Sequence, residues 1–432
     1  MILDDKLRVY ASNKQTSFAC QYYRLQIPLA QFEKAGYAVT WYDNGDQGPQ
    51  DSAAAMSRAD FDVFWCPTPH QLGMFQNIVG MKSGLLDGKF HLSPTLVIDV
   101  DDNRDYMHPH NPPGFVTQGV RGYPDTSLLQ PGQTLYSPDG DGKPHPLWVD
   151  KETYYSGIVF DIERNLTAMR LTHQMHRLAH AMTTPSPHLS RYLHEAIGVK
   201  YVHTFPNTII PEDYVSYPLV RKDKRVRILW QGGCSHDVDW YPLRHALKDV
   251  AAKHKDAVFV IFGEMIGWVA DYIPAEQLEW HPWVDYAAYK MKRALLNVDI
   301  NLCPLAKNLF NICKSAIKWY EGSVWDTPEG TLAADVPPYS DEMVDGETGL
   351  LYKDPKEFAE KLSLLIENAQ LRTRLGQAAK RWVLENRTPE QTIPPLWEFY
   401  NEVRDRRVGE YLMAQGASKS EIKRLAAQAG IR

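Results

Sequence analysis

The 432-residue chain contains few cysteines, and the five it has are scattered. They form no Cys-x-x-Cys pair, which argues against a zinc ribbon, and an odd, sparse set argues against a disulfide framework. No apolar run approaches the roughly 18 residues that a membrane span requires. The start, Met1-Ile-Leu-Asp-Asp-Lys, has no apolar stretch of the signal-peptide kind. We therefore expect a cytoplasmic protein without a membrane span.

An excess of basic residues is also missing. The formal net charge is −6 and the isoelectric point is about 6.2, so no global positive field indicates binding to nucleic acid or to an anionic membrane. Hydrophobic residues make up 44% and charged residues 23% of the chain, which is ordinary for a globular protein with a large core. The length predicts two or three domains.

Short apolar strands alternate with helical patterns in the first half of the chain. The sequence predicts a helix over residues 22–35, further helical structure over 158–182, and strands over 8–11, 37–42, 61–65, 95–100 and 201–205. Such alternation indicates an α/β fold with a parallel sheet. Residues 105–157 interrupt it with a Pro-, Gly- and Tyr-rich insertion. Its aromatic rings suit contact with a sugar or polymeric acceptor.

A second alternation begins at Arg225. It predicts strands over 226–230, 257–262, 278–281 and 298–302, with helices over 239–253, 286–296, 355–367 and 369–385. The two halves indicate two Rossmann-like doubly wound lobes with a cleft between them, over residues 1–207 and 208–388. Ligands of such folds bind at the carboxyl ends of the strands or between lobes. Residues 389–432 predict a terminal helix that packs back on the N-terminal lobe, followed by a basic helical tail that a capping box at Ser418–Glu421 opens.

The segment from Phe310 to Tyr352 combines cations, a carboxylate and glycine turns. Lys314 and Glu321 are seven residues apart, two helical turns, and Asn311 and Lys318 fall on the same face. A helix that starts near Cys313 would place its first amides beside Lys314, which suits a diphosphate, while Glu321 accepts hydrogen bonds from ribose hydroxyls. The alternative is that Glu321 pairs with a lysine on a solvated face.

A glycine turn follows the strand that ends at Trp230. Gly232 and Gly233 allow close approach of the backbone to a phosphate or sugar, and Ser235, His236 and Asp239 follow on the next turn. The competing interpretation is a tight turn in which Ser235 caps the next helix.

Polar residues also end strands of the first lobe. Asp101 and Asp102 follow an apolar strand, where carboxylates bind Mg²⁺ or Mn²⁺, hydrogen-bond substrate hydroxyls or cap the next element. Tyr23 and Arg24 open the first helix, and Arg24 either reaches the cleft or belongs to an ordinary surface helix with an aromatic anchor.

Two patterns resemble a known family. Phe310-Asn-x-x-Lys314-Ser-x-x-Lys318-x-x-Glu321, followed by Pro337-Pro-Tyr339 and Asp345-Gly-x-Thr-Gly349-Leu-Leu, resembles the C-terminal lobe of GT-B glycosyltransferases, the family-four-like retaining group. Ile228-x-Trp230-x-Gly232-Gly-x-Ser-His-x-x-Asp239 is similar to the first strand and turn of that lobe.

The resemblance implies transfer of a sugar, with retention, from a nucleotide-diphosphate sugar such as a UDP-sugar to an acceptor hydroxyl. It implies no cofactor and no metal, because lysines and backbone amides hold the leaving diphosphate. The acceptor is open among glycan, glycolipid, protein and modified DNA base. The implied catalytic residues are Lys314, Glu321, His236 and Arg24; donor-binding residues are Gly232, Gly233, Ser235, Asn311, Ser315, Lys318 and Glu321; acceptor-side residues are Asp101, Asp102 and Tyr23.

The chain departs from the family pattern after the Gly232-Gly233 turn, where many relatives carry an arginine and a lysine, and again before Glu321. Many relatives carry another glutamate eight residues before the one that matches Glu321, and Cys313 stands there in this chain. Two alternatives therefore remain. One is a transferase that acts on hydroxymethylated DNA bases, for which the insertion and the basic tail would grip a duplex. The other is a non-catalytic GT-B scaffold that binds a sugar or a partner.

Overall fold

The computed structural model describes most of the chain. The described residues are 8–12, 22–42, 63–67, 85–86, 89–90, 95–107, 162–215, 224–233, 236–265, 267–414, 416–421 and 424. Two compact units divide the chain. The first comprises Met1–Asp101, Arg170–Thr208 and Pro389–Arg432, and the second comprises Asp102–Met169 and Ile209–Thr388. Most of the insertion predicted at 105–157 lies outside the described residues.

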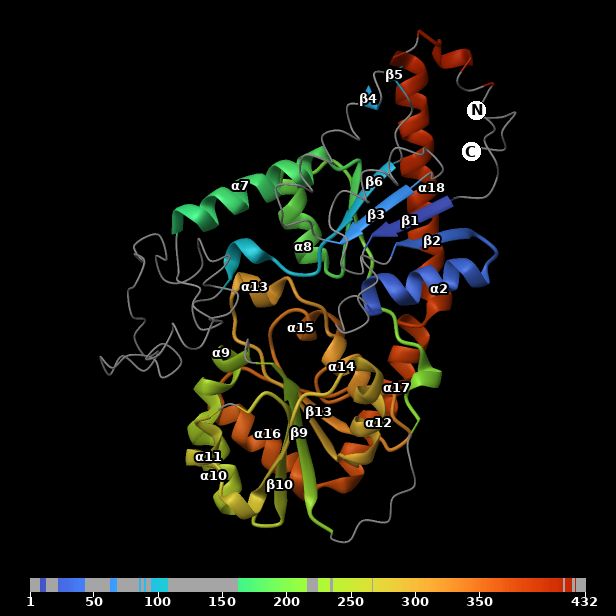
Figure 1. Ribbon diagram of the computed structural model, residues 1–432. Helices are drawn as coiled ribbons and strands as arrows, with labels where there is room; N and C mark the ends of the chain where they lie inside the picture. Colours follow the sequence, from blue (N-terminus) through green and yellow to red (C-terminus); the bar gives the residue numbers. More distant parts are fainter. Residues whose placement is uncertain are drawn as a thin grey trace. The chain divides into compact units, whose positions relative to one another are not determined.

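A parallel sheet forms the centre of the first unit (Figure 1). Its strand order is β2-β1-β3-β6-β7-β8, and every pairing between neighbours is parallel. The strands are β1 (Arg8–Ser12), β2 (Ala38–Tyr42), β3 (Val63–Pro67), β6 (Thr95–Asp99), β7 (Ala181–Thr184) and β8 (Val202–Thr204).

Strand β7 corrects the helix predicted over 158–182. The helix present there, α7, spans Ile162–Leu178, and the chain then enters the sheet at Ala181. All four residues of β7 are buried, because the strand lies between β6 and β8. A short buried strand that directly follows a helix has no alternating pattern by which a sequence would reveal it.

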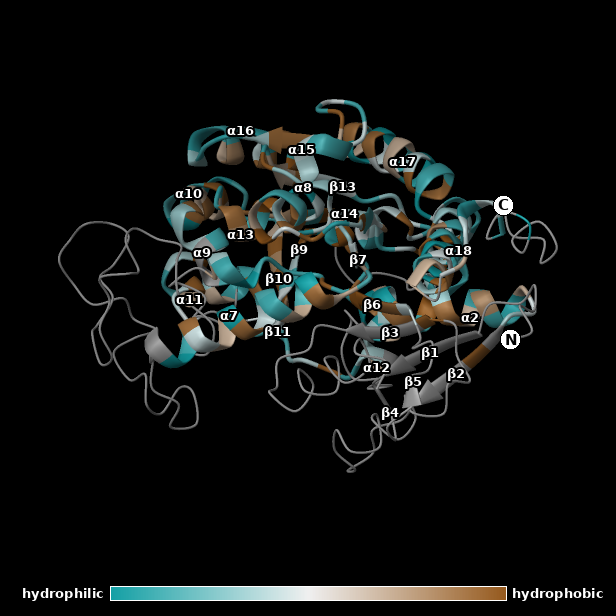
Figure 2. Ribbon diagram, turned by 90° about the horizontal axis from the view of Figure 1, so that it is seen from above, coloured by the Kyte–Doolittle hydropathy of each residue, from teal (hydrophilic) through white to brown (hydrophobic). Residues whose placement is uncertain are grey.

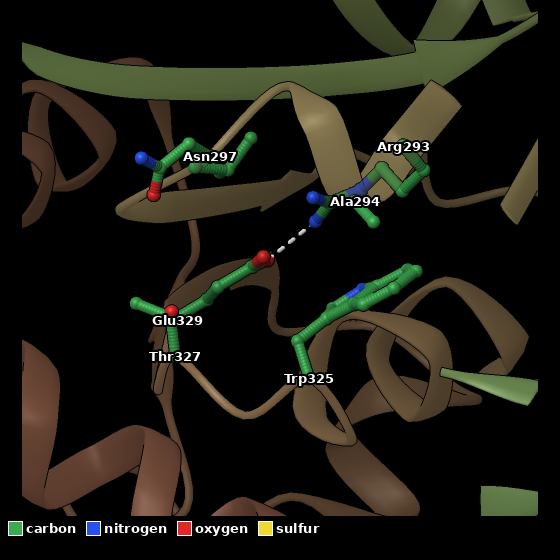
Figure 3. Close-up of a pocket in the computed structure, with 7 residues that line it drawn as sticks. Arg293, Ala294, Asn297, Trp325, Thr327 and Glu329 are labelled. Atoms are coloured by element: carbon green, nitrogen blue, oxygen red, sulfur yellow. Dashed lines mark hydrogen bonds and ion pairs between the residues drawn. The ribbon is translucent and has the colours of Figure 1, made fainter. Parts of the chain in front are cut away.

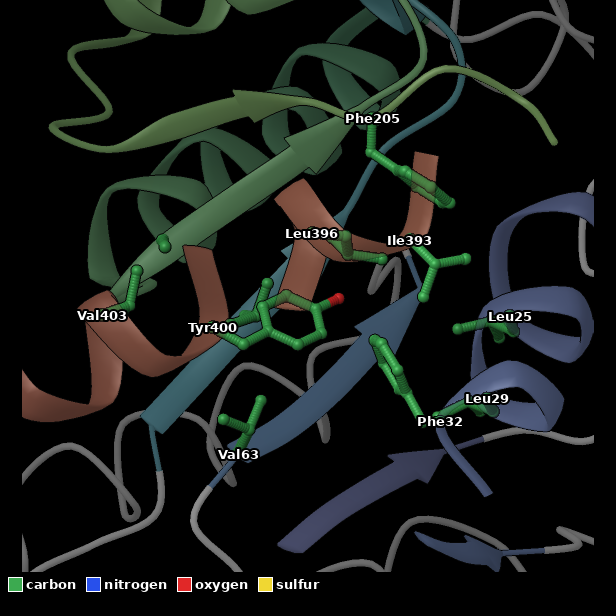
Figure 4. Close-up of a cluster of buried hydrophobic side chains, with 11 residues drawn as sticks. Leu25, Leu29, Phe32, Val63, Phe205, Ile393, Leu396, Tyr400 and Val403 are labelled. Carbon is green, nitrogen blue, oxygen red and sulfur yellow. The ribbon is translucent and has the colours of Figure 1, made fainter. Parts of the chain in front are cut away.

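The long helix α18 (Pro389–Ala414) supplies part of the first unit's core (Figure 4). Leu396 and Tyr400 of this helix are fully buried and pack with Phe32 of α2 (Ile27–Lys34) and with Val63 of β3. The chain therefore returns, after the whole second unit, to complete a core that its first hundred residues begin.

The second unit contains a sheet of the same kind. Its strand order is β11-β10-β9-β12-β13-β14, again with parallel neighbours throughout. The strands are β9 (Val226–Gly232), β10 (Ala257–Gly263), β11 (Leu278–His281), β12 (Ile300–Cys303), β13 (Gly330–Ala334) and β14 (Leu350–Tyr352). The direction of strand addition reverses between β9 and β12, which makes this the topological switch point of a Rossmann-like sheet.

Amphipathic helices cover this sheet, and Figure 2 shows hydrophilic and hydrophobic residues side by side on α16 and α17. The longer helices are α10 (Arg244–Lys253), α12 (Tyr286–Leu295), α16 (Pro355–Glu367) and α17 (Ala369–Asn386). Their starts follow local rules: Asp285 caps α12 by accepting from the Ala288 amide, and Asp354 caps α16 ahead of Pro355.

Short elements complete the two units. They are η1 (Tyr22–Gln26), β4 (Leu85–Leu86), β5 (Lys89–Phe90), η2 (Arg104–Tyr106), α8 (Pro187–Tyr192), η5 (Leu193–Ile197), η6 (Pro211–Asp213), α9 (Asp237–Trp240), η8 (Tyr241–Leu243), α11 (Val269–Tyr272), η9 (Ala275–Gln277), α13 (Leu309–Ile312), α14 (Ile317–Ser323) and α15 (Tyr339–Glu342). Among the described helices, none is both long enough and apolar enough to span a membrane.

Candidate active site

The candidate residues of the second unit gather at the carboxyl edge of its sheet. Strand β9 ends at Gly232 and leads into α9, while β12 ends at Cys303 and leads into α13 and α14. These two strands flank the switch point, and ligands of open α/β sheets bind beyond the strand ends at such a point.

The structure corrects the predicted helix over this segment. Helix α13 ends at Ile312 and α14 begins at Ile317, so Lys314 and Ser315 lie in the connection between two helices. Cys313 and Ala316 are both buried, and Ala316 has the non-helical ψ of 28°. The prediction of one helical face that carries both Lys314 and Glu321 is therefore wrong. Lys318 and Glu321, three residues apart, are the pair that shares a helix.

Three side chains form a hydrogen-bonded array beside the glycine turn. The Nδ1 atom of His236 lies 2.7 Å from Oδ2 of Asp239, and its Nε2 atom lies 3.2 Å from Nζ of Lys318. The other oxygen of Asp239 accepts from the Ala306 amide at 2.8 Å. Asp239 is 3% exposed, so its carboxylate is held within the protein rather than in solvent.

The protonation states of the array follow from its surroundings. Burial, together with the charge of Lys318, lowers the pKa of His236 to about 4, so its ring is neutral at pH 7. Burial opposes ionisation of Asp239, but its hydrogen bond from His236 and its other polar contacts leave its pKa below the usual value. An ionised Asp239 accepts the Nδ1 proton, so Nε2 is the acceptor for the Lys318 ammonium.

Lys318 is a cation that the protein solvates incompletely. Burial, against the opposing charge of Asp239 and with help from the charge of Lys314, lowers the pKa of Lys318 to about 8. Lys314 itself stacks its ammonium over the Phe310 ring, 4.5 Å from the centroid. A buried ammonium with a second lysine charge beside it is a suitable host for a dianionic group.

Glu321 lies on the same helix as Lys318 and is 7% exposed. Its Oε2 atom accepts from Nε2 of Gln231 at 3.1 Å and from the hydroxyl of Tyr289 at 3.1 Å. Burial and the Glu321 charge raise the pKa of Tyr289 well above its usual value, so this phenol remains a donor. Glu321 is thus oriented by Gln231 and Tyr289.

Gly232 is required where β9 ends. A Cβ atom at this position would lie 2.9 Å from the Trp230 ring, 3.1 Å from His236 and 3.3 Å from Nζ of Lys318. The backbone of Gly232 therefore approaches the array as closely as sterics permit. Gly233 has no such crowding: its nearest neighbour in the same test is Trp283 at 4.0 Å.

Asn311 helps to hold Asp239 of the array in place. Its side-chain nitrogen donates to Asp239 Oδ1 at 2.7 Å and to the Ala306 carbonyl at 2.8 Å, and the residue is 2% exposed. Both amide hydrogens are thus used inside the protein. The predicted role of Asn311 and Ser315 in donor binding stays a prediction, and Ser235 lies outside the described residues.

Arg24 occupies a buried site in the first unit. Its guanidinium forms a bidentate ion pair with Asp99, with 3.0 Å from Nε to Oδ1 and 2.6 Å from Nη2 to Oδ2. It also donates to the Phe205 carbonyl. Asp99 also accepts from Thr183 at 2.5 Å. In the described structure this arginine ties β6 to the end of β8, and its predicted catalytic role stays a prediction. Tyr23 is buried next to it at 3% exposure.

Asp101 and Asp102 are partly buried just after β6. Asp101 is the last residue of its segment in the first unit, and Asp102 begins a segment of the second. Across the part of the chain that is described, no group of three or more His, Cys, Asp or Glu side chains is arranged to hold a metal ion.

A small pocket opens at the other edge of the second sheet (Figure 3). Arg293 and Glu329 face each other across it, 2.5 Å apart and both nearly fully buried, with Trp325 against the guanidinium. Burial outweighs Arg293 and raises the pKa of Glu329 to about 7. Because Glu329 precedes β13 and Asn297 precedes β12, this pocket lies at the amino ends of the strands, away from the candidate site.

Two site residues escaped the sequence analysis. The sequence pattern places Gln231 only in a strand and Tyr289 only in a helix, although together they orient Glu321. A polar residue at the end of a strongly apolar strand, directly before Gly-Gly, was the available signal for Gln231. Nothing in the local sequence marks Tyr289.

Comparison with known proteins matches a segment, mostly in the second unit, to a family and most of the chain to a fold. Residues 242–396 match a family described as glycosyl transferase-like. No curated protein matches this sequence.

Several solved structures share the fold at low sequence identity. Sucrose-phosphate synthase from Thermosynechococcus elongatus superposes with a TM-score of 0.57 at 9% identity, over 92% of this chain and 99% of that one. Anabaena HepE, solved with UDP and glucose, gives 0.53 at 11% identity, over 91% and 98%. TarM gives 0.52 at 11% identity, over 78% of this chain, which spans 54% of the length of TarM.

The chain therefore has the fold of the GT-B glycosyltransferases, and its residues 242–396 are similar to a glycosyl transferase-like family. The predicted α/β architecture with two doubly wound sheets is confirmed.

Proposed function

We propose that this protein is a glycosyltransferase that moves a sugar from a uridine diphosphate sugar to an acceptor hydroxyl, with retention at the anomeric carbon. One observation carries the proposal: helix α14 presents Lys318 and Glu321 at the switch point, the first beside the Gly232 backbone and the second fixed by Tyr289 and Gln231. A cation and an oriented carboxylate at this distance along one helix suit the two ends of a ribose diphosphate.

Lys318 is the proposed main contact of the diphosphate, with Lys314 as the second cation. Charge-assisted hydrogen bonds from ammonium groups to phosphate oxygens are about twice as strong as neutral ones. As the bond between the anomeric carbon and the diphosphate oxygen breaks, the diphosphate leaves with the electron pair. Positive charge already in place stabilises that developing charge. On this account the reaction requires no metal.

Glu321 is the proposed acceptor for the ribose hydroxyls. An ionised carboxylate only accepts hydrogen bonds, and a ribose offers two adjacent hydroxyl donors. Because Tyr289 and Gln231 hold the carboxylate in place, its orientation is set before the nucleotide arrives, which lowers the entropic cost of binding.

The choice of uridine draws support from structures of the same fold. HepE has been solved with UDP and with UDP-glucose, and a variant of Staphylococcus aureus TarM with UDP. These proteins share 11% of their residues with this chain, so they support the nucleotide class of the proposal through the fold alone.

Nucleotide binding tests the proposal. UDP, GDP and ADP are titrated in EDTA against the wild-type chain and the variants Lys318→Met and Glu321→Gln, with affinity measured by calorimetry. We expect UDP to bind the wild type best and each variant to lose about 1.5–3 kcal/mol of binding free energy, roughly 10- to 100-fold in Kd.

Two exposed residues of α16 serve as matched controls. Lys356 and Glu360 carry the same charges four residues apart, with side chains 85% and 62% exposed, so Lys356→Met and Glu360→Gln should bind UDP as the wild type does. A wild-type chain that binds none of the three nucleotides, or site variants that bind UDP normally, would contradict the assignment.

A further inference from the structure

Asn103 is a buried polar residue that none of the roles above uses. It is 2% exposed and precedes η2, which packs against α13 within the second unit. Its side-chain nitrogen lies 3.4 Å from Sγ of Cys313. Its side-chain oxygen has no hydrogen-bond partner among the described residues. A buried amide oxygen without a donor costs free energy, so native structures usually supply a partner.

The thiol that faces Asn103 is unreactive and neutral. Burial raises the pKa of Cys313 to about 11, so the sulfur stays protonated at pH 7 and makes only a weak hydrogen bond. An amide that faces a thiol therefore keeps most of its hydrogen-bonding capacity in either orientation of its oxygen and nitrogen. What the site lacks is a strong donor for the amide oxygen.

Asn103 also lies close to the proposed diphosphate site. Cys313 directly precedes Lys314, with about 3.8 Å between their Cα atoms. The charge of Lys314 acts on His236, Asp239 and Lys318, so these groups share one electrostatic neighbourhood. Asn103 thus contacts the residue next to Lys314 in the chain, and a sugar joined to a diphosphate at these lysines would extend from this neighbourhood.

We infer that Asn103 is the residue that selects the transferred sugar, by accepting a hydrogen bond from one of its ring hydroxyls. The inference rests on the proposed function, since it needs a nucleotide-linked sugar at the two lysines. The amide and the thiol form a neutral surface where a carboxylate would place a charge. The donor class is therefore a neutral hexose, or its N-acetyl derivative, that directs a hydroxyl toward Asn103.

Selection between sugars would come from the cost of leaving the buried Asn103 amide without a hydrogen-bond partner. A site built to hydrogen-bond a hydroxyl discriminates strongly against an analogue that directs this hydroxyl elsewhere, because the buried amide is then left without a partner. Epimers that differ at a single ring carbon are the sharpest probes of such a contact.

The experiment compares the dissociation constants of UDP, UDP-glucose, UDP-galactose and UDP-N-acetylglucosamine, which requires no knowledge of the acceptor. The variants are Asn103→Leu, which keeps the volume without hydrogen bonds, and Asn103→Asp, which is nearly isosteric. Asn401→Leu on α18 is the control, because the Asn401 amide donates to the Trp397 carbonyl, in the first unit. Unfolding temperature is recorded for each.

Wild-type protein should prefer one UDP-sugar over the others by about tenfold or more. Asn103→Leu should lose most of this preference while UDP affinity stays within about twofold, and Asn103→Asp, which still accepts a hydrogen bond, should keep it. Asn401→Leu should keep the preference. Unchanged preference in Asn103→Leu overturns the inference, as does a joint fall of UDP affinity and unfolding temperature in this variant with the preference retained, which marks a packing role. Wild-type protein that does not bind UDP at all overturns the proposed function and this inference with it.

Discussion

Lys318 shares its surroundings with a second lysine, a neutral histidine and a buried aspartate. The histidine ring accepts from the ammonium and passes the contact to Asp239, so a hydrogen-bonded chain fixes the lysine's position without neutralising it directly. His236 and Asp239 are therefore positioning residues for the Lys318 ammonium. Sequence analysis had assigned the phosphate contact first to Lys314, which the structure places in a connection rather than on the helix.

The lowered pKa of Lys318, about 8, predicts how nucleotide binding depends on pH. Only the protonated form attracts a diphosphate, so UDP affinity should be close to its maximum at pH 7 and about half that value at pH 8. Above pH 8 it should fall, approaching tenfold per pH unit as the ammonium loses its proton. Isothermal titration from pH 7 to 9 measures this limb, and buffers of different ionisation enthalpy should show proton uptake on binding near pH 8.

Lys318→Arg is the companion to that measurement. A guanidinium stays charged at every pH in this range, so the falling limb should disappear even if absolute affinity is lower. A wild-type affinity that stays flat to pH 9 would show that Lys318 does not contact the diphosphate.

At the scale of elements, α18 determines whether the first unit has a complete core. Its residues Ile393, Leu396, Tyr400 and Val403 recur at intervals of three and four, so they share one face of the helix. That face packs on α2 and β3, more than three hundred residues earlier in the chain. A helix that closes a core from so far away contributes stability that no local pattern reveals.

Leu396→Ala measures this contribution. The side chain is 0% exposed, so its truncation leaves a cavity and should cost about 2–5 kcal/mol of unfolding free energy. Denaturant unfolding gives the value, and UDP affinity should not change. Leu364→Ala on α16, where the leucine is 43% exposed, should cost far less. Equal losses in the two variants would mean that α18 does not complete the core as described.

At the scale of the whole molecule, the chain consists of two units with separate sheets and separate cores. The chain crosses between them four times, after Asp101, Met169, Thr208 and Thr388. Lys314, Lys318, Glu321 and the residues that orient them all belong to the second unit. A nucleotide bound there stabilises the folded state of that unit by mass action.

Differential scanning calorimetry should therefore resolve two unfolding transitions. UDP at 100 times its Kd should add about 2.7 kcal/mol to the second unit and raise its transition temperature. The first unit's transition, recognised because Leu396→Ala lowers it, should stay where it is. If UDP raised only the transition temperature of the first unit, the assignment of the nucleotide site to the second unit would be wrong.

Much of the architecture was predictable because strands and helices leave local patterns. Helix α16 has the predicted bounds, and strands β9, β10 and β11 differ from prediction by at most two residues. The capping box at Ser418 is confirmed by reciprocal contacts with Glu421 at 2.9 Å and 3.2 Å. Strand β7 and the break between α13 and α14 were missed, since both depend on burial among distant elements.

The sequence by itself determined the class of fold and the residue types of the candidate site. These features are alternating apolar patterns, the Gly232-Gly233 turn, two lysines and Glu321. Each is defined by residues close together in the chain, so it can be recognised without the tertiary structure. Only the tertiary structure decided which of these groups meet. It joined His236 to Lys318, Gln231 and Tyr289 to Glu321, and Asn103 to Cys313, because sheet order and helix packing bring together residues that are tens to hundreds of positions apart.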